Sequence, residues 1–179
     1  MDKTKCMAAL FDFDGVVVDT EPQYTIFWDE QGRKYLSKED FGRSIKGQTL
    51  EQIFGGHFSG MDEIQQQIVS DLNEYEKHMK FDYMPGVVEF MKSLRAKDIK
   101  LAIVTSSNDL KMANVYREHP ELKTLVDRIL TSDSFTRSKP DPECFLMGAK
   151  VFDTTVDNCV VFEDSFHGLE AARRAGMKI

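Results

Sequence analysis

An apolar run near the N-terminus ends abruptly at two acids and a glycine. Residues 7–13 (MAALFDF) are almost continuously hydrophobic up to Asp12, and Asp14 and Gly15 follow directly. A short apolar run without regular polar alternation, bounded by a turn signal, is typical of a strand that is buried on both faces of a sheet. Such a strand needs a covering layer on each side, which indicates an α/β fold.

Similar runs recur much later in the chain, and helical patterns separate them. Residues 101–104 (LAIV) and 159–162 (CVVF) are again short and apolar, and residues 128–130 (RIL) form a weaker run. Strands that alternate with helices predict βαβ units, and therefore a doubly wound parallel sheet with a Rossmann-like core. The helical apolar positions are Val87, Phe90, Met91 and Leu94; Leu110, Ala113 and Tyr116; and Leu169, Ala172 and Ala175, which Gly176 closes.

Residues 19–84 differ from the rest because they contain no clear strand. They carry apolar stripes at helical spacing, and the glycine-rich segment 54–60 (FGGHFSG) is interpreted as a loop between two helices. We therefore predict an all-helical insertion at 19–84 within a discontinuous core formed by 1–18 and 85–179. The stripes are Tyr24, Phe27 and Trp28, with Gly32 near the helix end, and Ile64, Ile68, Leu72, Tyr75 and Met79.

Composition narrows the classes of partner. The chain has 179 residues and a formal net charge of −7. An acidic excess disfavours nucleic acid, which normally needs a basic face. Membrane association is also not expected, because no apolar run approaches the roughly 20 residues that span a bilayer. Residues 1–6 lack the apolar stretch and cleavage site of a secretory signal, so we expect a cytoplasmic protein. The oligomeric state stays open.

The strongest chemical signal is the pair Asp12 and Asp14. Carboxylates at positions i and i+2 of an extended chain point the same way, and Gly15 lets the backbone turn behind them. Open α/β sheets bind ligands at the carboxyl ends of their strands, where this pair is expected to lie. A turn or helix cap would explain one of the two aspartates, but explains two beside buried residues less well.

Three weaker signals follow the later runs. Thr105 and Ser106 follow residues 101–104 where a helix begins, so they are either phosphate ligands or ordinary helix caps. Lys139 lies in a stiff loop before Pro140; taken alone, it is interpreted as a solvated surface lysine. Glu163 and Asp164 leave the 159–162 run, and adjacent acids there need a partner or a metal.

The four signals together are more specific than any one of them. Their order, strand with DxD, strand with Thr/Ser, loop with Lys-Pro and strand with Glu-Asp, resembles the haloacid dehalogenase (HAD) superfamily of phosphatases and phosphotransferases over nearly the whole chain. The insertion at 19–84 is similar to the helical C1-type cap of that family. The resemblance is strongest to the branch that contains β-phosphoglucomutase, phosphoglycolate phosphatase and the sugar-phosphate phosphatases.

The resemblance implies a role for each core residue. Asp12 would be the nucleophile that becomes an aspartyl phosphate. Asp14 would act as general acid and then general base, and would also offer its backbone carbonyl to a magnesium ion. Lys139 would balance charge on the nucleophile and on the transferring phosphoryl group.

The remaining core residues would bind phosphate and metal. Thr105 and Ser106 match the phosphate-binding motif of the family. Glu163 and Asp164 match the acidic motif that completes the Mg²⁺ site beside Asp12 and Asp14, and oxygen ligands are what Mg²⁺ requires. The implied partner is a small phosphorylated metabolite, such as a sugar phosphate, that is hydrolysed through an aspartyl phosphate.

The cap loop would recognise the substrate. Lys46, Gly47 and Thr49 resemble the cap loop that faces the catalytic pocket in the mutase branch. Leu50 stands where β-phosphoglucomutase carries an arginine for its second phosphate, and Tyr24 where it carries a hinge histidine. A mutase must hold a bisphosphate and needs a cation at its far end. The departure at Leu50 therefore favours simple hydrolysis.

Three alternatives stay open beside the magnesium-dependent phosphatase. A phosphomutase would share every core motif. A non-enzymatic phospho-aspartate signalling domain would combine similar residues, but its phosphorylated aspartate follows a middle strand and no cap interrupts its chain. A dehalogenase would need no magnesium and usually lacks the second aspartate. The chain ends at Ile179, where a fifth strand should begin, so we expect the last strand of the family's sheet to be missing.

Overall fold

The computed structural model describes residues 7–179, and the N-terminal segment used above to argue against a secretory signal lies outside them. Four strands form a parallel sheet in the order β3-β2-β1-β4. Two of the strands match the predicted ranges, whereas the first strand is shorter than residues 7–13. The strands are β1 (Ala8–Phe11), β2 (Lys100–Val104), β3 (Arg128–Leu130) and β4 (Cys159–Phe162).

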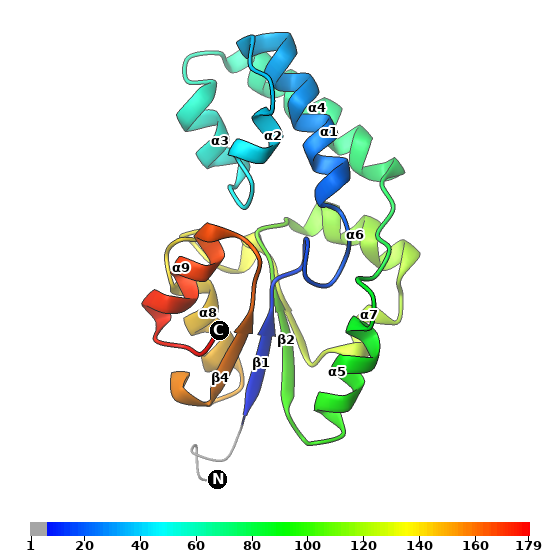
Figure 1. Ribbon diagram of the computed structural model, residues 1–179, viewed down its shortest axis with the longest axis vertical. Helices are drawn as coiled ribbons and strands as arrows, with labels where there is room; N and C mark the ends of the chain where they lie inside the picture. The colour runs from blue at the N-terminus through cyan, green and yellow to red at the C-terminus, as the bar shows by residue number, and fades with distance from the viewer. Residues whose placement is uncertain (1–6) are drawn as a thin grey trace.

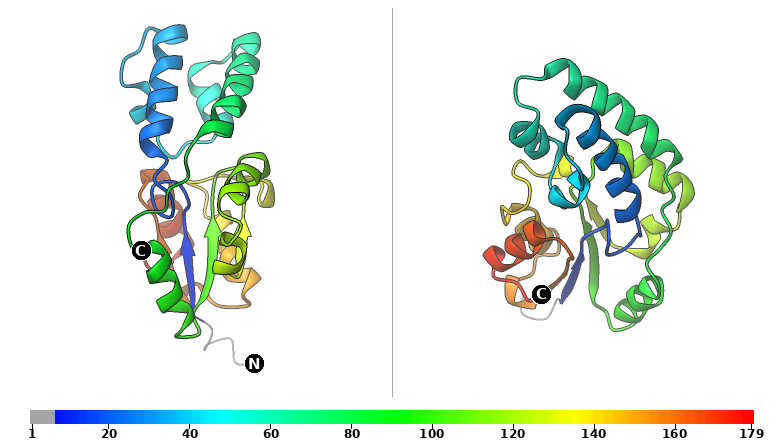
Figure 2. Two further views of the ribbon diagram at one scale, coloured as in Figure 1. Left: turned by 90° about the vertical axis from the view of Figure 1, so that its right-hand side faces the viewer. Right: turned by 45° about the horizontal axis from the view of Figure 1, so that its top comes forward.

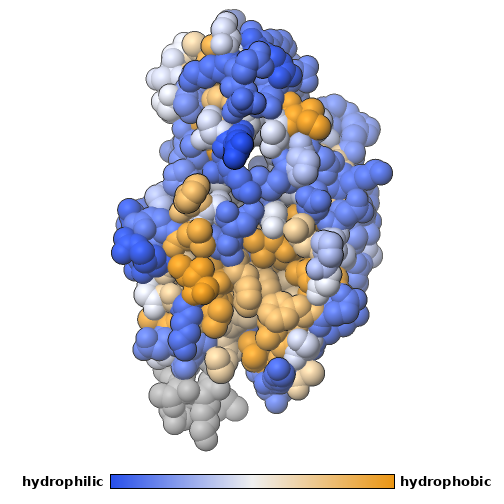
Figure 3. All heavy atoms as spheres, viewed as in Figure 1, coloured by the Kyte–Doolittle hydropathy of each residue, from blue (hydrophilic) through white to orange (hydrophobic). Residues whose placement is uncertain are grey.

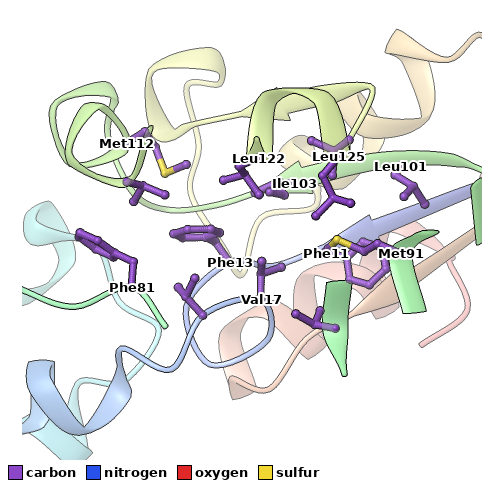
Figure 4. Close-up of a cluster of buried hydrophobic side chains, with 14 of the residues drawn as sticks. Phe11, Phe13, Val17, Phe81, Met91, Leu101, Ile103, Met112, Leu122 and Leu125 are labelled. Atoms are coloured by element: carbon purple, nitrogen blue, oxygen red, sulfur yellow. The ribbon is translucent and has the colours of Figure 1, made fainter. Parts of the chain in front are cut away.

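Helices cover both faces of this sheet, so the doubly wound α/β fold is confirmed (Figure 1). Alternate residues of β1 point to opposite faces, with Phe11 in one hydrophobic cluster and Leu10 in the other. The first cluster packs under α5 (Val87–Arg95), α6 (Asp109–Glu118) and α7 (Leu122–Leu125) (Figure 4). The second packs under α8 (Glu143–Val151) and α9 (Phe166–Ala175).

The predicted apolar face of α6 was wrong in phase. Leu110 is exposed and Tyr116 is only partly buried, whereas Met112 and Val115 are fully buried in the first cluster and Lys111 is also buried. The predicted spacing through Leu110 and Tyr116 found the helix but placed its buried side one residue away. The rotation matters because it turns a lysine, instead of a leucine, toward the carboxyl edge of the sheet.

Residues 19–84 form helices with a hydrophobic cluster of their own, which includes Trp28, Ile53 and Ile68. The stripe predicted along the longest helix is confirmed, since Ile68 and Leu72 are buried. Figure 2 shows these helices standing above one edge of the sheet. The elements are α1 (Glu21–Gln31), the π-helical η1 (Gly32–Leu36), α2 (Phe41–Ser44), α3 (Leu50–His57) and α4 (Asp62–His78).

The prediction that the glycine-rich segment 54–60 is a loop was wrong for its first half. Gly55 and Gly56 lie inside α3, which continues to His57. The helix tolerates them because a capping box opens it: Thr49 accepts a hydrogen bond from the backbone N–H of Gln52, and the Gln52 side chain accepts one from the backbone N–H of Thr49. The cap satisfies two N–H groups that would otherwise be unpaired, which offsets part of the cost of two glycines.

Two strand-like connections join residues 19–84 to the sheet. Val18 and Tyr83 form an antiparallel bridge, and the N–H of Asp19 donates to the carbonyl of Asp82 at 2.9 Å. The two passages of the chain therefore lie side by side where they leave the core. Backbone pairing at both passages limits the directions in which the helical block can move.

Beside β4 the chain pairs once more with the sheet. Lys178 forms an isolated parallel bridge with Val160 of β4, and the N–H of Val161 donates to the Lys178 carbonyl at 2.8 Å. Within residues 7–179 this single bridge does not extend into a fifth strand. Short 3₁₀ turns, η2 (Ser132–Ser134) and η3 (Val156–Asn158), complete the connections of the core.

Apolar surface gathers on the face of the core that is turned to the viewer in Figure 3, over β1 and β4 between α5 and α9. Phe90 and Phe166 are among the exposed large hydrophobic side chains. Within residues 7–179, none of the helices has both the length and the hydropathy that a bilayer crossing requires.

Candidate active site

The carboxyl ends of β1, β2 and β4 face a cavity of about 390 Å³, and the helices of residues 19–84 line its opposite side. Figure 1 shows these helices above the sheet. Parallel strands in register bring their ends to one edge, so side chains from distant parts of the sequence meet there. From the core, Asp12, Asp14, Thr105, Lys139 and Asp164 line the cavity. The loop and helices above it contribute a second wall, which includes Trp28, Lys46 and Leu72.

Asp12 and Lys139 form a buried ion pair at the floor of this cavity. The Lys139 ammonium donates to Oδ1 of Asp12 at 2.7 Å and to Oε2 of Glu163 at 2.6 Å. Lys139 is only 2% exposed, so its interpretation as a solvated surface lysine was wrong. Burial raises the pKa of Asp12 from 3.8 to about 7, although Lys139 opposes the rise. Burial also opposes the charge of Lys139, but the two carboxylates outweigh it and raise the pKa of the lysine.

Glu163 is held by hydrogen bonds on both oxygens. Its Oε2 binds Lys139, and its Oε1 accepts from the backbone N–H groups of Asp164 and Ser165 and from the Ser165 hydroxyl. The start of α9 supplies these donors, because Ser165 is the N-cap of that helix. The carboxylate is therefore fixed in orientation before any ligand arrives.

Asp12, Glu163 and Asp164 form a group of acids suited to a divalent cation. One carboxylate oxygen from each lies within 4.8 Å of those of the other two. Gly15, with φ of +82°, passes so close beneath the Asp164 carboxylate that a Cβ would collide with it. Three carboxylates of graded exposure at one point fit a hard oxygen-ligated cation such as Mg²⁺. The Asp14 carboxylate is outside this group, so its predicted metal contact stays with its backbone carbonyl.

Asp14 is engaged by a lysine that the sequence analysis did not single out. The Lys111 ammonium lies 2.6 Å from each Asp14 oxygen, and Thr20 and Ser107 also donate to this carboxylate. Burial alone would raise the pKa of Asp14, but Lys111 and the hydroxyl donors outweigh burial and lower the pKa below 3.8. The only available signal was the polar position at Lys111 beside the buried Met112 in the helix after residues 101–104.

Glu76, which the sequence analysis did not single out, connects α4 to α1 through Tyr24. The Tyr24 hydroxyl donates to Oε1 of Glu76 at 2.7 Å, and the Lys111 ammonium lies 4.6 Å from the centre of the Tyr24 ring. Burial raises the pKa of Glu76, while Lys111 opposes the rise. Tyr24, Glu76 and Lys111 all line the cavity, so this group forms its wall on the side of α6.

Thr105 and Ser106 lie where phosphate ligands were predicted. Thr105 is buried next to the Asp12 floor, and its hydroxyl accepts a hydrogen bond from the N–H of Ser107. Ser106 is half-buried and lines the cavity. Asn108 accepts from the N–H of Lys111 and caps α6, and the N–H of Asp109 donates to Asp133, so these N–H groups at the helix start already have partners.

The predicted cap loop reaches the core. The Lys46 ammonium lies 2.8 Å from Oδ2 of Asp164 and 3.2 Å from Oε2 of Glu21. Gly47, with φ of +78°, packs so closely on Ser165 that a Cβ would lie 2.7 Å from the serine Cβ. Thr49 lines the cavity, but its hydroxyl already caps α3. In addition, the Gln52 side chain donates to the Lys139 carbonyl at 2.8 Å.

Comparison with known proteins agrees with this geometry. Residues 9–179 match the model of the haloacid dehalogenase-like hydrolase family. The chain is 29% identical to a phosphorylated carbohydrates phosphatase of Thermotoga maritima, over 96% of this chain and 82% of that protein. It is 25% identical to β-phosphoglucomutase of Bacillus subtilis, over 95% of this chain and 80% of that protein.

A solved structure shows the same fold. The crystal structure of a hydrolase from Pseudomonas syringae aligns with a TM-score of 0.79 at 25% identity, over 96% of this chain and 82% of that one. The match covers the sheet, its helical layers and the helices above the cavity. The resemblance drawn from the four motifs is thereby confirmed. The chain belongs to the haloacid dehalogenase-like hydrolase family, in the branch that contains its phosphatases and phosphomutases.

Proposed function

We propose that this protein is a magnesium-dependent phosphatase that hydrolyses a small phosphorylated metabolite through an aspartyl phosphate on Asp12. Its membership of the phosphatase branch makes it a phosphomonoester hydrolase. The nucleophile, the acid-base group, the metal and the size of the substrate are the finer parts of the proposal. Residues 19–84 would form the cap, and residues 1–18 with 85–179 would form the catalytic core.

The observation that carries the proposal is the convergence of one nucleophile, one ammonium and two further acids at the floor of the cavity. Asp12 is buried and bonded to Lys139, and the oxygens of Glu163 and Asp164 lie within 4.8 Å of its own. A carboxylate that attacks a phosphate dianion must overcome like-charge repulsion. Lys139 supplies part of the neutralisation, and a bound Mg²⁺ would supply further charge compensation at the same point.

The first half-reaction would transfer the phosphoryl group to Asp12. An oxygen of Asp12 bonds to phosphorus while the bond from phosphorus to the leaving alcohol breaks, and Asp14 gives that alcohol a proton. In the second half-reaction, Asp14 takes a proton from water as the water oxygen attacks phosphorus. Asp12 is then restored and inorganic phosphate leaves. Thr105 and the N–H of Ser106 would hold the non-reacting phosphate oxygens.

The contacts of Asp14 support its proposed role as base in the second half-reaction. Lys111 binds both of its oxygens and lowers its pKa, which keeps the side chain ionised, the form that a general base needs. To act as the acid of the first half-reaction, Asp14 must carry a proton, and a protonated oxygen no longer attracts the Lys111 ammonium. We therefore expect the contact with Lys111 to loosen when the substrate is bound.

Hydrolysis is favoured over the mutase alternative by the composition of the cavity wall. Leu50 lines the cavity at the position that corresponds to the mutase arginine. Of the part of the chain that the structure describes, no arginine lines this cavity. A bisphosphate intermediate would therefore lack a bidentate partner for its far phosphate.

The test uses Asp12→Asn, which is close in size to the parent side chain. We expect this variant to hydrolyse p-nitrophenyl phosphate at no measurable rate with Mg²⁺, and the parent to lose activity in excess chelator and regain it when Mg²⁺ is returned. Thermal denaturation of both proteins controls for folding. Retained turnover in Asp12→Asn, or full parental activity in the chelator, contradicts the proposal.

A further inference from the structure

Carboxylates outnumber ammonium groups around the cavity, and the ammonium groups already have acidic partners. Seven carboxylates and three ammonium groups line it. Each of the three lysines already contacts acids: Lys139 contacts Asp12 and Glu163, Lys46 contacts Glu21 and Asp164, and Lys111 contacts both oxygens of Asp14. Within residues 7–179, therefore, no cationic side chain facing the cavity lacks an acidic partner.

One of these carboxylates, that of Glu76, has an oxygen that accepts no hydrogen bond from residues 7–179. Glu76 of α4 is 6% exposed, and its Oε1 accepts from Tyr24. Its other oxygen, Oε2, has no hydrogen-bond partner in the described part of the chain. Asn73, one helical turn earlier, also lines the cavity and likewise makes no side-chain hydrogen bond there. Residues at i and i+3 share a helix face, so the two side chains present free acceptors and a donor to one space.

Part of the wall formed by residues 19–84 is apolar. Trp28, Leu50, Ile53 and Leu72 line the same cavity as Glu76, together with polar side chains such as Gln48. A substrate bound with its phosphate at Asp12 would place its leaving group among these residues, because the cavity extends from the core floor to α4. Among the described residues, Glu76 has no hydrogen-bonded cationic partner, so a second anionic group placed against its carboxylate is disfavoured, whereas a hydroxyl can donate to it.

We propose that Glu76 makes this enzyme selective for phosphomonoesters whose leaving group is uncharged and hydroxylated, and that it rejects leaving groups that carry a second anion. The inference rests on the proposed phosphatase activity and adds the chemical class of the leaving group. A leaving group with a second phosphate and one with a carboxylate would both be rejected, because each places a negative charge beside the Glu76 carboxylate. Asn73 would assist by binding a second hydroxyl with its amide.

Two matched substrates test this selectivity. Glycerol 3-phosphate and 3-phosphoglycerate have the same chain length and differ mainly in a terminal hydroxymethyl or carboxylate group. We expect the parent to prefer glycerol 3-phosphate by at least about tenfold in kcat/KM, because rejection of a mispaired charge weakens binding of the transition state. Glu76→Gln should reduce this preference several-fold, chiefly by lowering KM for 3-phosphoglycerate.

Two further variants separate charge from folding. Glu74→Gln removes an exposed acid of the same helix that does not line the cavity, so it should keep the parental preference. Asn73→Asp adds a carboxylate beside Glu76 and should widen the preference, which gives a readout if Glu76→Gln is unstable. The inference is overturned if the parent uses both substrates equally, or if neither Glu76→Gln nor Asn73→Asp changes the ratio. If p-nitrophenyl phosphate is not hydrolysed either, the proposed phosphatase activity fails first and the inference fails with it.

Discussion

Asp12 and Asp14 lie two residues apart, yet their surroundings shift their pKa values in opposite directions. Burial raises the pKa of Asp12 to about 7, whereas Lys111 and two hydroxyl donors lower that of Asp14 despite its burial. Paired carboxylates with separated pKa values are typical of sites where one group is the nucleophile and the other transfers protons. The difference arises because burial outweighs Lys139 at Asp12, whereas Lys111 and the hydroxyl donors outweigh burial at Asp14. Both lysines come from segments far along the chain.

Asp14→Asn should separate proton transfer from nucleophilic attack. We expect both half-reactions to slow by about 10²–10⁴-fold with an alkyl phosphate, because a lost general acid or base typically costs that much. A p-nitrophenyl ester needs no proton for departure, so the variant should release one rapid equivalent of nitrophenolate and then stall. Rapid-mixing absorbance measures this burst.

The control for Asp14→Asn concerns Lys111. The substitution removes the charged partner of a buried ammonium, which can lower stability on its own. The double variant Asp14→Asn/Lys111→Met removes both charges and should recover stability but not turnover. If the rate of the first half-reaction fell equally for the alkyl and p-nitrophenyl esters, and no burst were seen, Asp14 would have a structural role only.

At the scale of elements, α3 shows how a local cap decides where a helix begins. Glycines at positions 55 and 56 disfavour a helix, but the reciprocal bonds of Thr49 and Gln52 start one before them. Gln52 also donates to the Lys139 carbonyl, so the same residue that caps α3 connects it to the loop that holds Lys139. The start of this helix is therefore a point where residues 19–84 and the sheet's loops depend on each other.

Thr49→Ala should destabilise the folded protein by about 1 kcal/mol, the usual cost of a lost N-cap. Urea denaturation at fixed temperature measures the change, and Thr49→Ser should recover most of it because serine keeps the accepting oxygen. Hydrolysis of p-nitrophenyl phosphate should change little, since the Thr49 hydroxyl is already used within α3. A large loss of kcat with unchanged stability would instead assign Thr49 to the substrate.

At the scale of the whole molecule, residues 19–84 meet the core at two kinds of contact. The paired passages at Val18 and Tyr83 are backbone contacts, whereas Lys46 crosses the cavity mouth to Asp164. Exposed ion pairs of this kind contribute little to stability, so the Lys46 contact can break at small cost. The Gln52 bond to the Lys139 carbonyl is a further contact that must break on opening. The paired passages can then act as a hinge about which the helical block opens to admit substrate and closes to exclude water.

Lys46→Ala should change substrate recognition more than chemistry. We expect a higher KM for metabolite-sized substrates and a changed ranking among them, because their leaving groups reach the cap loop. Hydrolysis of a very small ester such as methyl phosphate should stay close to the parental rate. Kinetics across a panel of phosphate esters measures both, with Lys77→Ala on the outside of α4 as control. An unchanged ranking would remove Lys46 from the substrate site.

Local patterns in the sequence determined the framework of this protein. Apolar runs of four or five residues become parallel strands because burial on both faces requires continuous hydrophobicity, and the acids that end them meet at one sheet edge because parallel strands share a direction. Asp12, Glu163 and Asp164 were found in this way. Each could be recognised from residues directly beside it in the sequence.

Only the tertiary structure decided the partners of those acids. Lys111 meets Asp14, and Tyr24 meets Glu76, across long separations in sequence that no local pattern records. The phase of α6 depends on how it packs against the sheet, and a rotation of one residue decides whether a leucine or a lysine faces Asp14. Lys139 is likewise buried where its ammonium meets Asp12, Glu163 and the Val104 carbonyl, all of which are distant from it in sequence. Such contacts depend on the packing of both helical layers against the sheet. Which lysine pairs with which acid in the site is therefore decided only by the tertiary structure.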